Sequence, residues 1–252
     1  MTIAQQPIDF PLGGSAWAID VPADAGGDDL LAALALPTPR STVVVNGTAA
    51  GIGPELGERL AAAFGDGGLA GAARRGGLTT VTGGTDAGIF SILGRAMAGC
   101  PAPMVGVAPR GLVTWPGRVV PGPVPASCGD RVGLEPHHSH FVLVAGTRWG
   151  EETAVLLALA RALGALAPSV AVVCGGGPVT QKEALGHVRD GRRVVVLVGS
   201  GRFADELAAA AGARASDDPG IAEIVASGLL TLCPLRSGAQ ALVDSVMAAL
   251  DR

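Results

Sequence analysis

The chain has 252 residues, of which 48% are hydrophobic and only 16% charged, a balance that excludes intrinsic disorder and is sufficient for a large buried core. The formal net charge is -4 and adjacent positive residues occur only as pairs such as Arg192-Arg193, so the broad basic surface that nucleic-acid binding requires is missing. The chain starts without a signal-peptide pattern, its longest apolar run is interrupted by Arg161 and its 4 cysteines stand far apart, so we expect a cytoplasmic protein without a membrane span.

Short β-branched runs alternate with Ala- and Leu-rich segments that have helical spacing. The expected strands are 41–47, 78–84, 103–109, 139–146, 169–177, 192–201 and 228–234, and the expected helices are 52–65, 87–99, 150–166, 180–189, 202–213 and 236–250. The strand runs are continuously apolar, which is typical of parallel strands covered on both faces. The pattern therefore predicts one doubly wound α/β domain over residues 1–252, with a mostly parallel sheet of about seven strands and helices on both faces.

Two parts of the chain are less regular. Residues 1–40 are expected to pack as an irregular segment on the edge of the sheet. Residues 108–138 are rich in proline and show little periodicity. A long irregular excursion inside a compact domain is more often a functional loop than scaffold, so we expect a loop or lid here. The sequence leaves open whether it closes over a ligand.

Four of the expected strands end in small, flexible or polar residues. They read "VVVNGTAAG", "VTGGTDAG", "VVCGGGPVT" and "VLVGSGR". Glycine lets a phosphate approach the backbone amides closely, and the following helix offers free N–H groups to an anion. Any one of these segments alone is most simply explained as a turn. Because parallel strands bring their carboxyl ends to one edge, the four together favour a phosphate-bearing, nucleotide-like ligand at that edge.

Individual residues take roles in this hypothesis. The expected ligand contacts are Gly47, Gly83, Gly84, Thr85, Gly88, His138, Gly176, Gly177, Thr180, Gly199, Ser200 and Arg202. Arg202 offers a bidentate fork to a phosphate or carboxylate, although a surface arginine at a helix start is the alternative. Asp86 is expected to cap the helix that follows it. Neither the dinucleotide-binding fingerprint nor the P-loop lysine motif is present, so ordinary NAD and ATP sites are poorly supported.

The segment "LEPHHSHFVLV" contains three of the chain's 4 histidines. His138 and His140 would share one face of a strand, but no further cysteine or histidine cluster completes a ligand set, so we expect no metal site. The imidazoles are expected to hydrogen-bond the loop or the ligand. A serine nucleophile elbow of the type Gly-x-Ser-x-Gly is also missing from the sequence.

A set of motifs in fixed order carries a family resemblance. It comprises "TVTGGTDAGIFSILGRA", "GVAPRG", "LEPHHSHFVLVAGTRWGEE", "VVCGGGPVT" and "VVVLVGSGRFADELA". Over about residues 40–215 the chain resembles the LSDAT branch of the SLOG superfamily, which includes the cytosolic N-terminal region of TRPM cation channels and stand-alone prokaryotic relatives. The resemblance implies a Rossmann-like fold that binds nucleotide-derived ligands such as ADP-ribose and requires no cofactor. The contacts it implies are Gly83, Gly84, Thr85, Gly88, Gly176, Gly177, Thr180, Ser200 and Arg202.

The same superfamily includes the LOG phosphoribohydrolases, which use a Gly-Gly-x-Gly-Thr-x-x-Glu motif. "GGPVTQKE" keeps Gly176, Gly177, Thr180 and Glu183 but has Val179 at the third glycine. The Arg-Lys pair of those enzymes is also missing, and only Arg161 lies near the matching distance. We therefore expect a non-catalytic sensor, with a nucleotide N-glycosidase using Glu183 and Arg161 as the alternative. A partner-binding module with a vacant pocket is a third reading, and any output would come from an unidentified effector protein or from a homodimer.

Overall fold

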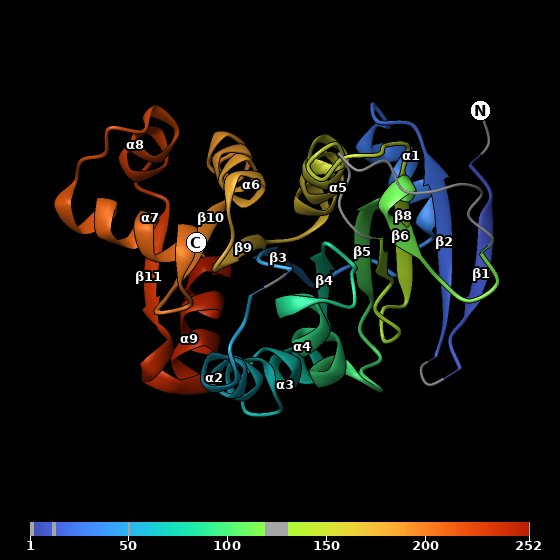
Figure 1. The fold of residues 1–252 in the computed structure, drawn as a ribbon, viewed down its shortest axis with the longest axis horizontal. Helices are drawn as coiled ribbons and strands as arrows, with labels where there is room; N and C mark the ends of the chain where they lie inside the picture. The colour runs from blue at the N-terminus through green and yellow to red at the C-terminus, as the bar shows by residue number, and fades with distance from the viewer. Residues whose placement is uncertain (1–2, 12–13, 50, 119–130, 252) are drawn as a thin grey trace.

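The computed structural model describes residues 3–11, 14–49, 51–118 and 131–251, and its centre is a nine-stranded sheet (Figure 1). The strands are β1 (Gln5–Asp9), β2 (Ser15–Val21), β3 (Ser41–Gly47), β4 (Leu78–Thr82), β5 (Met104–Pro109), β8 (His140–Val144), β9 (Ser169–Cys174), β10 (Arg193–Val198) and β11 (Leu230–Pro234). Their order is β1-β2-β8-β5-β4-β3-β9-β10-β11, and only the β1–β2 pair is antiparallel.

Helices cover both faces of this sheet (Figure 1). One layer contains α1 (Gly27–Leu34), α5 (Thr153–Leu166), α6 (Pro178–Arg189), α7 (Arg202–Ala213) and α8 (Pro219–Ala226), and the other contains α2 (Pro54–Phe64), α3 (Leu69–Gly76), α4 (Gly88–Met97) and α9 (Gly238–Leu250). In β3, Val43 and Val45 pack against the second layer, whereas Val44 packs against the first. A strand buried in this way needs apolar residues at consecutive positions, which confirms the predicted Rossmann-like α/β fold.

The chain reverses its direction of travel through the sheet between β3 and β9. From β3 it moves through β4 and β5 to β8, and then returns to the other side of β3 to form β9, β10 and β11. The connection after β3 enters α2 on one face, and the connection after β9 enters α6 on the other. Such a reversal opens a crevice at the carboxyl ends of the two strands, where ligands of open α/β sheets bind.

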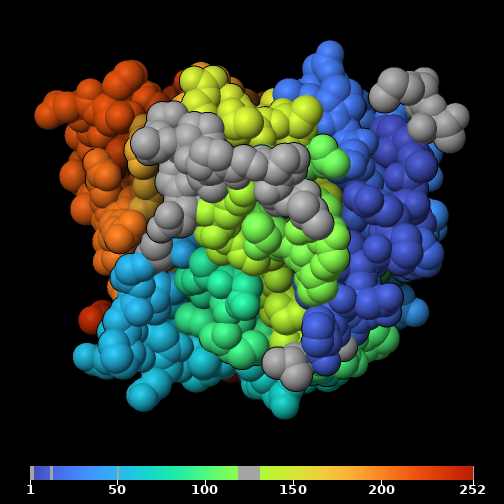
Figure 2. Space-filling model, turned by 45° about the vertical axis from the view of Figure 1, so that its right-hand side comes forward, coloured from blue at the N-terminus to red at the C-terminus, as the bar shows by residue number. Residues whose placement is uncertain are grey.

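The N-terminal region is more regular than the sequence predicted, because β1, β2 and α1 all lie within residues 1–40. These strands extend the sheet at one edge, at the right of Figure 2, far from α7 and α8 at the left. The alternation in β2 differs from the central strands: Trp17 is 47% exposed, whereas Ala16 and Ala18 are buried. Pro7 in β1 is compatible with an edge strand, where an N–H group can be spared. A continuous apolar run was therefore the wrong pattern to seek here.

Both ends of the region 108–138 form regular structure that packs against the sheet. A short 3-10 helix (Arg110–Leu112) leads to β6 (Val113–Thr114), which pairs in parallel with β7 (Val132–Gly133). Val113 and Leu134 are buried with Phe141 of β8. The two ends of the predicted loop are thus part of a packed face of the sheet. The prediction of a lid concerns mainly residues 119–130, which lie outside the described residues.

Candidate functional site

A cavity of about 180 Å³ lies at the carboxyl edge, where the β3 and β4 ends meet the starts of α5 and α6. We call it the acid pocket, and its lining residues are Gly47, Ala49, Gly83, Thr85, Phe90, Trp149, Glu152, Val179, Thr180 and Glu183. The lining includes four of the predicted ligand contacts and the alternative catalytic residue Glu183. Complete small-molecule sites usually measure about 300–1,000 Å³, so this cavity fits one ring-sized part of a larger ligand.

Thr85 gives the acid pocket an unused polar group. Thr85 follows the β4 strand and is 1% exposed, and its Oγ1 atom has no hydrogen-bond partner among the residues that the structure describes. Nearly all buried polar atoms in native proteins are paired with protein, water or ligand. A buried hydroxyl that lines a cavity without a partner is therefore available to a ligand.

Two buried carboxyl groups face the same pocket. Glu183 lies three residues after Thr180, so both side chains share one face of α6. Burial, and then the neighbouring Glu152, raise the pKa of Glu183 to about 8, although the Asn46 side-chain amide donates a hydrogen bond of 3.0 Å to its Oε2. Burial also raises the pKa of Glu152, whose Oε2 accepts from the Gly150 N–H at 2.7 Å. The Glu183 carboxyl is therefore mostly neutral at pH 7.

Sequence reasoning did not identify Glu152. It is adjacent to Glu151, and the two glutamates in "RWGEE" cannot be told apart by pattern. In the structure Glu151 is bonded to Arg148 through its side chain, with an N–O distance of 2.8 Å, whereas Glu152 is buried at the start of α5. The sequence did contain one signal for a site residue here: both glutamates follow a predicted strand within a few residues, and ligands of parallel sheets bind at the carboxyl ends of strands.

The side chain of Arg202 lies beside the loop that follows β3. A Cβ atom added to Gly51 in that loop would lie 2.5 Å from Nη2 of Arg202. Arg202 begins α7 with a φ of 52°, a left-handed conformation that costs a residue with a side chain about 1–2 kcal/mol. The guanidinium forms no ion pair with any residue in the described ranges. A strained backbone and a guanidinium without an ion pair among the described residues single this position out for a role beyond packing.

The turns after β9 and β10 are bonded to each other. Ser200 Oγ accepts from the Gly175 N–H at 2.8 Å and donates to the Leu197 carbonyl at 2.5 Å. The hydroxyl proton is thus used within the protein, and the contact of Ser200 with a ligand stays a prediction that the second lone pair of its oxygen would serve. Gly177 has open space where a Cβ would stand, a Cβ on Gly199 would lie 4.0 Å from the Cβ of Leu235, and one on Gly176 would lie 2.5 Å from the Thr180 hydroxyl. Of these three glycines, Gly177 leaves most room for a ligand.

Three other glycines of the predicted site are explained by contacts within the chain. A Cβ on Gly47 would overlap the carbonyl oxygen of Cys174, and one on Gly88 would overlap that of Thr48. A Cβ on Gly84 would lie 2.7 Å from the Cα of Gly106 in β5. Of these three, only Gly47 lines the acid pocket. Close approach between backbones is therefore sufficient to require glycine at these positions.

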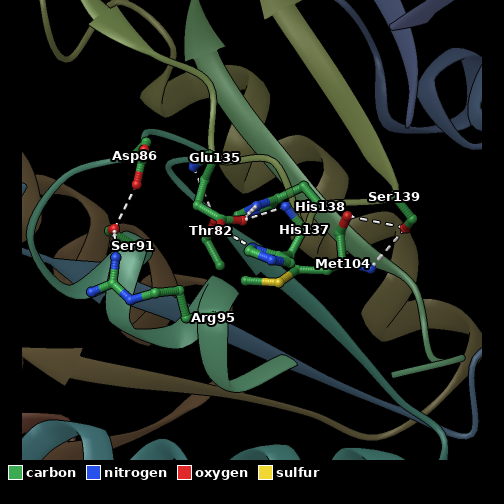
Figure 3. A network of polar contacts seen from close by, with 10 residues as sticks. Thr82, Asp86, Ser91, Arg95, Met104, Glu135, His137, His138 and Ser139 are labelled. Atoms are coloured by element: carbon green, nitrogen blue, oxygen red, sulfur yellow. Dashed lines mark hydrogen bonds and ion pairs between the residues drawn. The ribbon is translucent and has the colours of Figure 1, made fainter. Parts of the chain in front are cut away.

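Asp86 does not cap α4, so that prediction was wrong. The residue preceding α4 is Ala87, and no side chain accepts a hydrogen bond there. Asp86 instead accepts from the Ser91 hydroxyl at 2.5 Å, and Ser91 in turn accepts from Arg95 (Figure 3). These residues line a separate, open groove of about 840 Å³ between α2 and α4.

His138 is buried behind the turn that follows β4 rather than in the acid pocket (Figure 3). Its Nδ1 lies 2.8 Å from Oε2 of Glu135 and its Nε2 lies 2.8 Å from Oγ1 of Thr82, which accepts from the Gly84 N–H at 2.9 Å. Burial raises the pKa of Glu135, but the stronger effect of hydrogen bonds from His138 and His137 holds that pKa below its ordinary value. This network fixes the turn from behind, so His138 supports the site without lining it.

Arg161 is not part of the acid pocket. Its side chain donates to Oδ1 of Asp190 at 2.9 Å. Asp190 follows the last residue of α6, whereas Glu183 lies in the first half of that helix. The structure thus does not bring together the alternative catalytic pair of Glu183 and Arg161.

The described ranges contain neither a metal-ligand cluster nor a membrane-spanning helix. No group of three or more His, Cys, Asp or Glu side chains in those ranges could hold a metal ion. None of the helices there has the length and apolar character needed to cross a bilayer.

Comparison with known families agrees with the fold and with the order of the motifs. Residues 40–244 match the family model described as "SLOG in TRPM, prokaryote". Among curated proteins, none matches the chain significantly. The matched region runs from the residue before β3 into α9, and so includes every residue of the acid pocket. The chain therefore belongs to the prokaryotic family of SLOG domains related to those of TRPM channels.

Proposed function

We propose that the protein binds a nucleotide-derived ligand at the carboxyl edge of the sheet, with a ribosyl group in the acid pocket, and does not cleave it. The observation that carries the proposal is the unpartnered Thr85 hydroxyl beside the buried carboxyl groups of Glu152 and Glu183. The hydroxyl groups of a ribose donate to carboxylate oxygens and can accept from a threonine hydroxyl. A cavity of about 180 Å³ also suits a ribose rather than a whole nucleotide.

The charges at the edge favour a ligand with one anionic end. The acid pocket has no lysine or arginine in its lining, so a phosphate inside it would face two carboxyl groups. Arg202 lies instead beside the β3–α2 loop, and Gly177, in the turn before α6, has open space around it. An arginine fork and the N-terminus of a helix both suit a phosphate. We assign the phosphate of the ligand to this side of the edge.

Trp149 supports a base or second ring at the mouth of the pocket. It lines the cavity and its side chain remains 40% exposed. Aromatic side chains in such positions stack on nucleobases, with about 1–3 kcal/mol for each stacked base. ADP-ribose, the ligand type implied by the resemblance to the channel branch, combines all three features and is the first ligand to test.

Thermal unfolding with added nucleotides tests the proposal, because a ligand that binds only the folded chain raises the melting temperature. We expect ADP-ribose to raise it, ribose 5-phosphate to raise it less, and Arg202→Ala to weaken both effects. Thr85→Val should weaken the effect as well, since it removes the pocket hydroxyl at nearly constant volume.

Thr80→Val is the matched control for Thr85→Val. Thr80 Oγ1 is also buried without a partner, but Thr80 does not line the acid pocket. Both variants should fold at least as stably as the wild type, because each removes an unsatisfied polar atom. Only Thr85→Val should bind more weakly. Equal affinities for the two variants, or no response to any nucleotide, would contradict the proposal.

A nucleotide N-glycosidase is the second candidate, and the raised pKa of Glu183 is the observation that favours it. A carboxyl group that is neutral near pH 7 can donate a proton to a leaving base, while a second carboxyl stabilises positive charge at the sugar. Chromatography of AMP incubated with the protein tests this directly. Release of adenine that is lost in Glu183→Gln would establish hydrolysis and replace the binding-only proposal.

A further inference from the structure

A buried chain of hydrogen bonds connects Glu183 to an arginine outside the acid pocket. Arg192, in the turn before β10, has its Nη1 atom 2.8 Å from Nδ1 of His187. Nε2 of His187 lies 2.9 Å from Oδ1 of Asn46 in β3, and Nδ2 of Asn46 lies 3.0 Å from Oε2 of Glu183. All four side chains are buried. Only Glu183 reaches the acid pocket.

The arginine determines the direction of every bond in this chain. A guanidinium has donors and no acceptor, so Nδ1 of His187 must accept and cannot carry a proton. The proton of the neutral imidazole is then on Nε2, which donates to the Asn46 oxygen. The Asn46 amide group is thereby oriented with its nitrogen toward Glu183, and Oε2 of Glu183 must accept. Burial, and then the charge of Arg192, lower the pKa of His187 well below its ordinary value, which keeps the ring neutral.

Arg192 is itself held in place by groups that do not belong to the pocket. Its Nε donates to the Ser169 hydroxyl at 3.0 Å, and its Nη2 donates to the Ala160 carbonyl at 2.8 Å. A carboxylate oxygen of Asp190 lies 3.9 Å from Nη1. The guanidinium therefore has a fixed orientation that does not depend on the state of Glu183.

We propose that Arg192 and His187 are positioning residues for Glu183: through Asn46 they direct an N–H donor at Oε2 and so favour Oε1 as the oxygen that carries the carboxyl proton. A neutral Glu183 then presents its proton to the ligand or to Glu152 and never to Asn46. The use of that proton for recognising a nucleotide rests on the proposed function. The direction of the hydrogen bonds from Arg192 to Glu183 does not depend on that function.

Other charged groups near Glu183 do not replace this effect. Glu152 faces it from the start of α5 and raises its pKa, whereas Asn46 lowers it. On α6 itself Lys182 precedes Glu183 but is exposed, whereas the buried titratable group is His187, which acts through Asn46. If the chain is broken at Arg192, the imidazole can take the other tautomer and the Asn46 amide can turn over. Donation to Glu183 is then no longer enforced, and its pKa should rise.

The tautomer of His187 tests the direction in the unaltered protein. Long-range proton–nitrogen correlation spectra distinguish a protonated Nε2 from a protonated Nδ1 in each imidazole. We expect His187 to be neutral with its proton on Nε2 throughout the range of pH 6 to 8. A proton on Nδ1, or a charged ring, would overturn the proposal without any variant having to fold.

The titration of Glu183 in the ligand-free protein tests the positioning role. Carbon-13 labelling of glutamate carboxyl groups, with Glu183→Gln to assign the signal, gives the midpoint. Arg192→Met should raise it by about one pH unit, a tenfold change in the ratio of neutral to ionised carboxyl. Arg192→Lys retains a donor for His187 and should return the midpoint toward the wild-type value. Ser169→Ala, which removes a bond to Arg192 outside the chain, is the control and should not move it.

Equal midpoints in Arg192→Met and the wild type would show that the chain does not act on Glu183. An equal rise in Arg192→Met and Arg192→Lys would assign the effect to packing instead. Neither experiment uses a nucleotide, so failure of the proposed function and failure of this inference give different results.

Discussion

Arg202 is the residue at which local structure and the proposed function conflict most clearly. Its φ of 52° would suit glycine, yet the sequence retains an arginine whose side chain lies beside the β3–α2 loop. Arg202→Gly and Arg202→Ala both remove the guanidinium, but only glycine relieves the backbone. We expect Arg202→Gly to be more stable than Arg202→Ala by about 1 kcal/mol in urea unfolding, and both to bind nucleotide equally weakly.

Ala35 provides a control for this comparison, because it has a φ of 50° at the end of α1 and lies outside both described cavities at the carboxyl edge. Ala35→Gly should gain stability without any change in affinity. If the two Arg202 variants unfold at the same urea concentration, strain at this residue is not significant.

The prediction of site residues from the sequence succeeded where a motif places a side chain in or just after a turn. It failed where a residue was chosen only by its distance along the chain. Thr85, Thr180 and Glu183 were identified and do line one cavity. Arg161 was chosen by its distance along the chain, but its carboxylate partner lies beyond the end of α6. Glu152 was missed because burial, which separates it from Glu151, is a tertiary property.

At the scale of elements, glycines set how closely the turns approach neighbouring strands. Gly84, in the turn after β4, lies against Gly106 of β5, and a Cβ on Gly106 would lie 2.6 Å from the Cα of Gly84. We expect Gly106→Ala to destabilise the protein by about 1–3 kcal/mol, as overpacking of a core does. Gly133→Ala is the control, since Gly133 is in strand conformation with open space around its Cα.

Chemical unfolding of the two variants measures the difference. A cost at Gly106 that greatly exceeds that at Gly133 would assign the Gly84 turn to backbone packing. Equal stabilities of the two variants would show that backbone packing does not require glycine at position 84. The predicted ligand contact of Gly84 would then be the remaining explanation for this glycine.

Strands with a continuous apolar run were predictable, including β11 at one edge, whereas the strands of the N-terminal edge and the shortest helices were not. A continuous run such as "STVVV" has few alternatives to a central parallel strand, and all seven predicted runs became strands of the sheet. β1 and β2 alternate or contain proline, and the short helices α1, α3 and α8 have too few turns for a clear period. Their structure depends on the neighbours that they cover.

For the whole molecule, topology converts residues that are distant in sequence into one electrostatic unit. The reversal between β3 and β9 brings Asn46 to Glu183, and the α5 start supplies Glu152. None of these pairings is visible in a local pattern, because the carboxyl groups interact only after the sheet has formed. Such a unit should be detectable in the pH dependence of global stability.

Glu183 should make the protein less stable as the pH rises from 6.5 to 8. Its pKa is about 8 in the folded chain and near 4.5 when unfolded, so the folded state binds more protons between these values. Stability therefore falls with rising pH across the window, by at most about 1.4 kcal/mol per pH unit. His187 and His140 have lowered pKa values, so they make stability rise with pH, and only below about pH 6.5, where the unfolded chain binds their protons.

Urea unfolding at intervals of half a pH unit measures the slope of stability against pH. Glu183→Gln should weaken it and leave the part that Glu152 contributes through its own raised pKa, whereas Glu151→Gln should preserve it, because hydrogen bonds at Thr147 and Arg148 lower the pKa of Glu151 and confine its effect to acid pH. The same slope in wild type and Glu183→Gln would mean that Glu183 is ionised in the folded protein at neutral pH.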